Sequence, residues 1–291
     1  MGRADLHTHS TISDGTISPS ELVKMAVEAG LHGISLTDHD SVDGLMEFMN
    51  ATAPRHLQRV PGLEISTLYK SKEAHLLGYF VPMDNSQLFS KLQWLREVRE
   101  RRFPKMLSKL TEMGISVEIE YLDKLLNGVK SPGRPHIGRI LIDHGVVQDM
   151  DEAFDRYLNR GCPLYVEKEK MSIEEAIALL RNVGAVPVVA HPLTIQVSGV
   201  YDLLVELKEM GLSGVETVYD YSHFRISEDP SEIIRASDDL SLIKTGGTDY
   251  HGPGWRVPVG GVSVSADVVD ELRKSSIELG GEPDSWVVDE I

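Results

Sequence analysis

Residues 5–15 read DLHTHSTISDG, in which two histidines stand one residue apart and an aspartate follows. Along an extended strand, residues i and i+2 lie on the same face about 7 Å apart, so His7 and His9 can reach one ion together. Two interpretations compete: a polar strand end at the surface, or a metal site that begins in the first strand. The rest of the sequence has to decide between them.

Size and composition are those of an ordinary globular protein. The chain has 291 residues, 41% of them hydrophobic and 25% charged, enough for one large α/β domain or a core domain with an insert. No apolar run approaches the roughly 18–20 residues that cross a bilayer, and we see no secretory signal. A single cysteine, Cys162, excludes an intrachain disulfide and a cysteine-rich zinc site. We therefore expect a cytoplasmic protein that does not bind membranes.

The net charge of −16 restricts the partners. Binding to duplex nucleic acid relies on lysine and arginine against phosphate, so an acidic chain argues against such partners. A small phosphorylated substrate still fits if cations in the site reverse the local sign. The sequence leaves the oligomeric state open.

Short apolar runs alternate with helical periodicity in two parts of the chain. We expect strands at residues 4–9, 32–40, 59–66, 74–81, 185–191, 213–218 and 241–251, with a polar turn at 67–73. We expect helices at 18–30, 172–184, 200–211 and 265–281. Residues 84–161 are instead helical and densely charged, so we expect an all-helical insert there. Repeated βα units favour a parallel sheet, closed as a barrel or open.

Metal-ligating residue types gather at the strand ends. Six histidines and three carboxylates occupy these positions: His7, His9, Asp14, His39, Glu64, His75, His191, Asp249 and His251. Strand ends of a βα barrel converge on one face, so these side chains should meet. His75 begins its strand instead of ending it, which an antiparallel fourth strand would explain.

The joint pattern favours a metal site over a purely structural role for these residues. A lone histidine at a strand end more often has a structural role. Six histidines and three carboxylates on one face are unlikely to occur together by chance. Imidazole mixed with carboxylate suits zinc, manganese or iron better than magnesium or calcium. Nine ligands exceed the needs of one ion, so we expect two to three divalent ions with Glu64 as a bridge.

These residues resemble the polymerase and histidinol phosphatase (PHP) family. The segments that carry the resemblance span the chain: DLHTHSTISDG, LTDHD, GLEIS, HLLGYF, VAHP and GGTDYH. The resemblance implies an α/β fold, a distorted (β/α)7 barrel, formed by residues 1–83 and 162–291, with 84–161 as a helical insert that caps the substrate. It also implies three ions, one held by His7, His9, Glu64 and Asp249, one by Glu64, His75 and His191, and one by Asp14, His39 and His251.

The GRPH segment in the insert resembles the stand-alone phosphoesterase branch of this family. That branch implies hydrolysis of phosphomonoesters of 5′-nucleotides or 3′,5′-bisphosphonucleotides, by attack of a metal-bound hydroxide. Arg134 and His136 are candidates for a second phosphate clamp, because guanidinium matches phosphate, while a surface salt bridge is the alternative for Arg134. His223 is a weaker candidate for substrate binding. Histidinol-phosphate hydrolysis, 5′–3′ trimming of short RNA and a non-catalytic metal-binding module are the competing functions.

Overall fold

The computed structural model describes residues 2–286 except 128, 130, 131, 167–169, 225, 227 and 228; the side chains of 99 and 100 are also outside the description. Seven strands form the body of the molecule: β1 (Arg3–Asp5), β2 (Gly33–Leu36), β3 (Gln58–Tyr69), β4 (Lys72–Tyr79), β6 (Val186–Val189), β7 (Gly214–Val218) and β8 (Ile243–Gly246). They lie in the order β8-β7-β6-β4-β3-β2-β1. Two short strands, β5 (Met171–Ser172) and β9 (Val264–Ser265), pair with β3 and β1.

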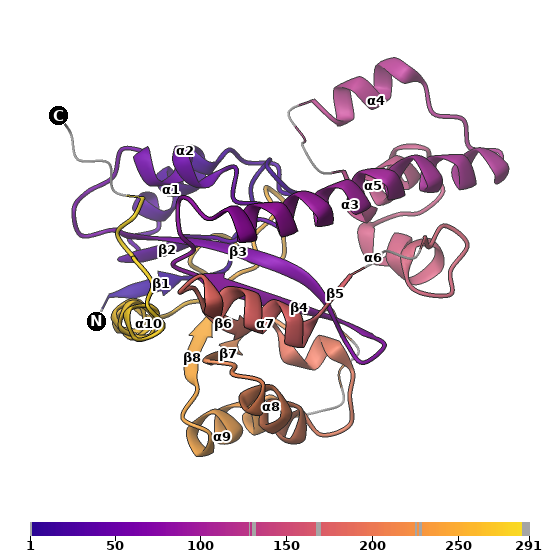
Figure 1. Cartoon of the computed structure of the whole chain (residues 1–291). Coiled ribbons are helices and arrows are strands. Elements are labelled where there is room, and N and C mark those ends of the chain that lie inside the picture. Colours follow the sequence, from indigo (N-terminus) through magenta and orange to yellow (C-terminus); the bar gives the residue numbers. More distant parts are fainter. Residues whose placement is uncertain are drawn as a thin grey trace.

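The sheet closes on itself next to the first motif. The Leu6 amide donates to the Gly246 carbonyl (3.1 Å), and the Asp249 amide donates to the His7 carbonyl (2.8 Å). Thr8 and Tyr250 form a parallel bridge one step further on. These bonds join the ends of β1 and β8, so the sheet is a nearly closed barrel and the prediction of an α/β barrel is confirmed (Figure 1).

One strand runs against the others and distorts the barrel. β4 is antiparallel to both of its neighbours, β3 and β6. Its start therefore lies at the carboxyl end of β3, where His75 pairs with Ser66, as the position of His75 in the sequence suggested. The predicted turn at 67–73 is wrong in length, because the ladder continues to the pair Tyr69–Lys72. Thr67 is buried in this hairpin, and its hydroxyl donates to the Ala74 carbonyl (2.7 Å), which favours the longer strand.

Two of the helices that pack around the barrel begin at side-chain caps. α1 (Pro19–Glu28) begins after Ser18, whose hydroxyl accepts from the Glu21 amide, and Gly30 follows its end with φ of +66°. α7 (Ile173–Asn182) begins with a reciprocal capping box between Ser172 and Glu175. The other helices of the barrel are α2 (Leu45–Asn50), the 3₁₀ turn η2 (Pro192–Ile195), α8 (Val200–Glu209), α9 (Ser231–Asp239) and α10 (Asp267–Glu278). The sequence analysis did not anticipate α2, η2 or α9.

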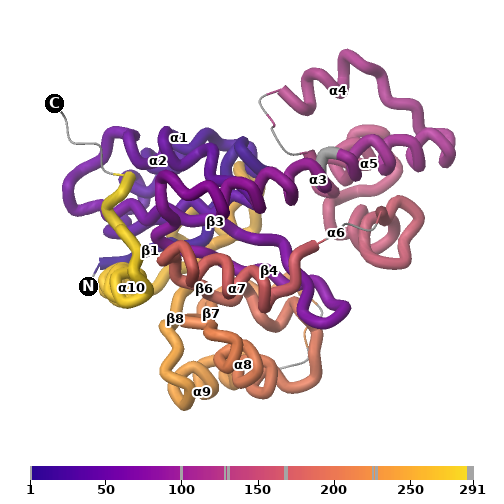
Figure 2. The backbone as a smooth tube through the Cα atoms, viewed as in Figure 1, coloured from indigo at the N-terminus to yellow at the C-terminus, as the bar shows by residue number. Residues whose placement is uncertain are grey.

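A group of helices projects from one side of the barrel (Figures 1 and 2). It comprises α3 (Ser86–Glu112), α4 (Ile119–Leu125), α5 (Arg134–Asp143), α6 (Met150–Ala153) and the π-helical turn η1 (Phe154–Leu158). The first half of α3 packs Leu88, Leu92 and Leu95 into the barrel core. Its second half contributes Phe103 and other apolar residues to a separate core shared with α5. One continuous helix thus connects the two cores.

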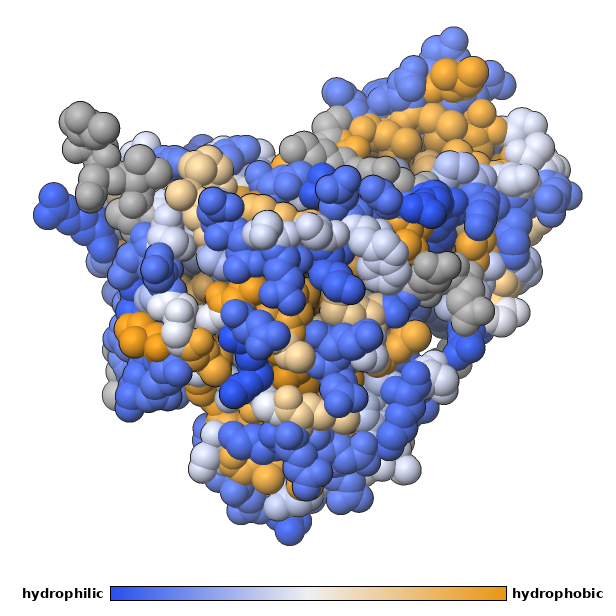
Figure 3. Space-filling view, in the orientation of Figure 1, coloured by the Kyte–Doolittle hydropathy of each residue, from blue (hydrophilic) through white to orange (hydrophobic). Residues whose placement is uncertain are grey.

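The surface in Figure 3 is mainly hydrophilic, and apolar atoms gather over the outer part of the projecting helices. Among the exposed large apolar side chains there are Met113 at 42% and Ile119 at 72% exposure. Although α3 has 27 residues, no helix in the described part of the chain is long and apolar enough to span a membrane.

We predict that Gly247→Ala destabilises the fold where the barrel closes. A Cβ at position 247 would lie 2.4 Å from the His7 backbone nitrogen and 2.9 Å from the His7 Cα, so backbone would have to move. Such overpacking costs about 1–3 kcal/mol in the free energy of unfolding. Chemical denaturation measures the change. Gly133→Ala is the control, because its Cβ would meet only Pro135 Cδ at 3.7 Å; equal stability of the two variants would contradict the prediction.

Candidate metal centre

Glu64 lies at the centre of the nine side chains that the sequence singled out. Its side chain is 1% exposed. Five imidazole nitrogens surround its two oxygens: His75 Nδ1 (2.9 Å) and His191 Nε2 (3.2 Å) at Oε1, and His39 Nδ1 (3.0 Å), His9 Nε2 (3.2 Å) and His7 Nε2 (3.5 Å) at Oε2. The carboxylate thus faces histidines on both sides, as a bridging ligand must.

The two aspartates extend this cluster. Asp249 Oδ1 lies 3.2 Å from His9 Nε2 and 3.4 Å from His7 Nε2. Asp14 lies 3.2 Å from His251 Nε2 and 3.7 Å from His39 Nε2. Four overlapping groups within the described residues could each hold an ion, with donor atoms within 4.8 Å of one another: His9–Asp14–His39–His251, His7–His9–Asp249, His7–Glu64–His191 and His39–Glu64–His75.

Several donor atoms of the cluster lack a hydrogen-bond partner among the described residues. Buried atoms of four residues form no well-aligned hydrogen bond in the described structure: His9 Nδ1, Asp14 Oδ1, His39 Nδ1 and Glu64 Oε2. Moreover, the Nε2 atoms of His7 and His9 lie 3.2 Å apart. Two imidazole lone pairs at this distance repel unless a cation or proton lies between them. Buried polar atoms without partners are costly, so this arrangement fits divalent metal ions.

The pKa values of two clustered histidines also fit a metal site. Burial lowers the pKa of His9, but the adjoining carboxylates of Asp249 and Glu64 outweigh burial and raise that pKa to about 10. This part of the cluster therefore favours positive charge. For His39, burial prevails over Glu64 and Asp14 and lowers the pKa to about 4, which keeps the imidazole neutral and able to ligate a metal.

Buried carboxylates hold the loops that carry these ligands. Asp38 accepts hydrogen bonds from the amide and hydroxyl of Ser10 (2.8 and 2.6 Å) and from the hydroxyl of Ser13 (2.6 Å). Asp40 accepts from the amide of Ser66 (2.8 Å) and from its hydroxyl (3.0 Å). Both aspartates are buried, and each restrains a segment next to the cluster.

The sequence analysis did not identify three residues that bind and restrain members of the cluster or the segments next to it. Asp5 accepts from the amide and hydroxyl of Thr248 (3.0 and 2.7 Å), and burial raises the pKa of its carboxyl to about 6. The Tyr219 hydroxyl donates to Asp249 Oδ2 (2.9 Å). Glu216 is fully buried beside His7. The available signal was an acidic residue inside a short apolar strand, as in ADL and GVETV.

A cavity of about 790 Å³ lies between the cluster and the projecting helices. On the barrel side Asp14, His39, His75 and His251 line it, together with Trp255. On the other side it is lined by residues of the insert and its connection to the barrel, among them Arg102, Arg134, His136, Phe154 and Lys170. The GRPH segment therefore faces the cluster across an open space.

The substrate-binding candidates occupy different places. Arg134 lines the cavity, and its Nη2 lies 2.9 Å from Glu73 Oε2. His136 lines it too, and its Nδ1 accepts from the Gly133 amide (3.1 Å). His223 instead pairs with Asp151 of α6 at 3.5 Å, where both side chains are exposed, and it is not among the lining residues.

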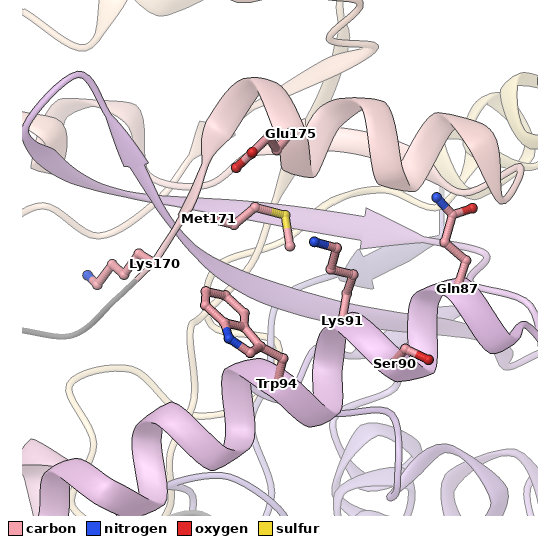
Figure 4. A pocket seen from close by; sticks show the side chains of 7 residues that line it. All are labelled: Gln87, Ser90, Lys91, Trp94, Lys170, Met171 and Glu175. Atoms are coloured by element: carbon pink, nitrogen blue, oxygen red, sulfur yellow. The ribbon is translucent and has the colours of Figure 1, made fainter.

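A second cavity, of about 560 Å³, lies outside the cluster (Figure 4). Lys91 and Trp94 of α3 face Met171 of β5 and Glu175 of α7 across it. None of the nine clustered residues lines it, so it is not the metal centre.

Comparison with known proteins identifies the family. The PHP domain model matches residues 5–174, and the chain belongs to the PHP family. A 5′-3′ exoribonuclease of Haemophilus influenzae is 31% identical over 86% of this chain and 91% of its own. A 3′,5′-nucleoside bisphosphate phosphatase of Chromobacterium violaceum is 30% identical over 87% of this chain and 89% of its own.

Solved structures share the fold. A Bifidobacterium adolescentis protein assigned as a metal-dependent phosphoesterase superposes with a TM-score of 0.83 at 28% identity, covering 94% of this chain and 96% of its own. An amidohydrolase of C. violaceum, with bound sulfate and no metal, has a TM-score of 0.82 at 27% identity and the same coverage. The PHP fold thus extends over nearly the whole chain.

We predict that His9→Ala lowers metal affinity without unfolding the protein. His9 belongs to two of the four donor groups, so its loss removes one ligand from each. Outer partners of metal ligands typically contribute 10–100-fold to affinity, and we expect at least about 100-fold for a direct ligand. Calorimetric titration with Mn²⁺ or Zn²⁺ measures the affinity, and circular dichroism checks the fold. His56→Ala, an exposed histidine, is the control; unchanged binding by His9→Ala would contradict the assignment.

Proposed function

We propose that this protein is a metal-dependent phosphoesterase that hydrolyses phosphomonoesters of nucleotides, either 5′-nucleotides or 3′,5′-bisphosphonucleotides. One observation carries the proposal: a single cavity has the imidazole and carboxylate cluster on one wall and arginine and lysine on the other. The phosphoesterase names of the PHP relatives support the reaction class. The sulfate in the C. violaceum structure shows that a related chain can hold a tetrahedral oxyanion.

The cluster suits two to three divalent ions of manganese, zinc or iron. We assign one ion to His7, His9, Asp249 and Glu64. A second is assigned to Glu64, His75 and His191, and a third to Asp14, His39 and His251. When bound, such ions lower the pKa of water and neutralise charge on a phosphoryl group. The described side chains need supply no covalent nucleophile for this reaction class.

The opposite wall is suited to a second phosphate. Glu73 binds Arg134 Nη2 at 2.9 Å through Oε2 and Lys170 Nζ at 2.8 Å through Oε1. Arg102 lines the same cavity. Arg134 and Lys170, two cations on the single carboxylate of Glu73, leave a local excess of positive charge within a chain of net charge −16. Buried cations of this kind favour a compact anion, and the guanidinium fork matches phosphate oxygens.

His136 acts on this wall by positioning. It is buried, and its Nδ1 accepts from the amide of Gly133, which directly precedes α5. This bond fixes the start of α5, from which Arg134 projects. The guanidinium of Arg134 also lies over the Phe154 ring, with 5.4 Å to the ring centroid, so its plane is restrained.

The insert, residues 84–161, serves in this proposal as a substrate cap. Its aromatic and apolar side chains, Phe154 among them, line the cavity opposite Trp255 of the barrel. Trp255 packs against the ligand His251, with ring centroids 4.3 Å apart. Flat apolar surfaces between two charged walls suit the nucleoside part of a substrate, since bases stack on aromatic rings. The net charge of −16 disfavours binding to long nucleic-acid duplexes. Nucleotide substrates, and a chain with a single cysteine, suit a cytoplasmic protein.

A substrate panel tests the proposal. Phosphate release should be measured with Mn²⁺ and with Zn²⁺ on 5′-nucleotides, 3′,5′-bisphosphonucleotides, histidinol phosphate and a short 5′-phosphorylated RNA. We expect metal-dependent release from the nucleotides, abolished by a chelator. Preference for the RNA or for histidinol phosphate would replace the substrate class, and release from none would favour a metal-binding module.

We predict that Arg134→Ala separates substrate binding from chemistry. Loss of a charged hydrogen bond of about 1.5–3 kcal/mol corresponds to a roughly 10- to 100-fold rise in KM for a bisphosphonucleotide. Hydrolysis of a simple aryl phosphate, which has no second phosphate, should change little. Steady-state kinetics on both substrates give the comparison. Arg235→Ala, an exposed arginine of α9, is the control, and equal losses on both substrates would disprove the clamp.

A further inference from the structure

Glu216 of β7 contacts two of the clustered histidines on the side away from the cluster centre. Its side chain is fully buried. Oε1 lies 3.1 Å from His7 Nδ1, and Oε2 accepts the backbone amide of His191 at 2.8 Å. One carboxylate therefore reaches both His7 and His191, and neither contact uses the Nε2 atoms that face the cluster.

The contact with His7 selects which ring nitrogen carries the proton. A carboxylate accepts hydrogen bonds and cannot donate them, so Nδ1 of His7 is the protonated nitrogen. Its Nε2 then directs a lone pair towards the cluster, where Asp249 Oδ1 lies at 3.4 Å. Ligating histidines usually have such a partner on the second nitrogen, and the partner also raises the basicity of the ligand.

The contact with His191 acts on the backbone. His191 has a φ of +27°, which is rare for a residue with a side chain. The bond from its amide to Glu216 holds this conformation, and its Nδ1 lies 2.8 Å from the Thr194 hydroxyl. Nε2 is thereby left directed at Glu64 Oε1, 3.2 Å away.

We propose that Glu216 is a positioning residue that presents His7 and His191 to the metal ions and so sets affinity in the two donor groups that contain His7, one of which also contains His191. The inference rests on the proposed metal centre. It assigns a function to a carboxylate that binds no ion itself. The barrel could accommodate an apolar residue at this strand position more easily than a buried charge, which costs several kcal/mol unless it is compensated. The compensation here comes from two hydrogen bonds, both of which position ligands.

Glu216→Gln tests this inference because it preserves the shape of the side chain. The amide oxygen can still accept from His191, but the NH₂ group then faces His7 Nδ1 and favours the wrong tautomer. We expect zinc affinity to fall 10- to 100-fold in calorimetric titrations. In the zinc-loaded wild type, histidine nitrogen NMR should show a His7 Nδ1 proton in a strong hydrogen bond, assigned with His7→Gln, and the variant should lose this signal.

Glu206→Gln is the matched control, since it replaces a surface carboxylate that accepts from the Tyr69 hydroxyl. A purely structural Glu216 would lower the melting temperature of the metal-free variant and leave zinc affinity and the His7 signal unchanged, which would overturn the proposal. If the variant does not fold, the wild-type spectrum decides: a His7 without an Nδ1 proton overturns the inference. Zinc binding without phosphate release would contradict the proposed function and leave the role of Glu216 intact.

Discussion

Everything in this structure depends on placing a carboxylate, Glu64, inside a ring of imidazoles. A buried charge costs several kcal/mol unless it is neutralised, and here five histidine nitrogens approach its two oxygens. Such a cluster is stable only if the backbone around it cannot relax. The nearly closed barrel supplies that rigidity, since the ends of β1 and β8 are joined by backbone hydrogen bonds directly beside His7.

Buried carboxylates next to the cluster add to this rigidity. Asp38, Asp5 and Glu216 are buried, and each binds backbone or hydroxyl groups of a segment that carries residues of the cluster. They restrain three segments that are far apart in the sequence. Distances between donor atoms are thereby fixed before any ion binds, which is the preorganisation that a metal centre requires.

The two walls of the cavity come from different parts of the chain. The barrel carries the donor cluster, whereas Arg134 and Phe154 reach the cavity from the insert. Because α3 is continuous from one core into the other, changes in the insert can alter the second wall while the barrel keeps its form. This division is consistent with PHP relatives that share a fold and carry the names of different phosphoesterases.

The sequence by itself determined an α/β fold, the helices that begin near Ser18 and Ser172 and the set of side chains that would meet, because strand periodicity and polar strand ends are local patterns. Closure of the sheet into a barrel was expected only from the resemblance to the PHP family. The antiparallel β4 could be suspected only from the odd position of His75, and the length of its hairpin was misjudged because the paired residues 67–69 include polar ones. Tertiary structure alone decided the rest. Glu216 and Tyr219 act through partners 25 to 209 residues away in the sequence. Arg134 of the insert and Lys170 come together only because both bind Glu73 of β4. Contacts of that kind depend on the path of the whole chain, which no local pattern encodes.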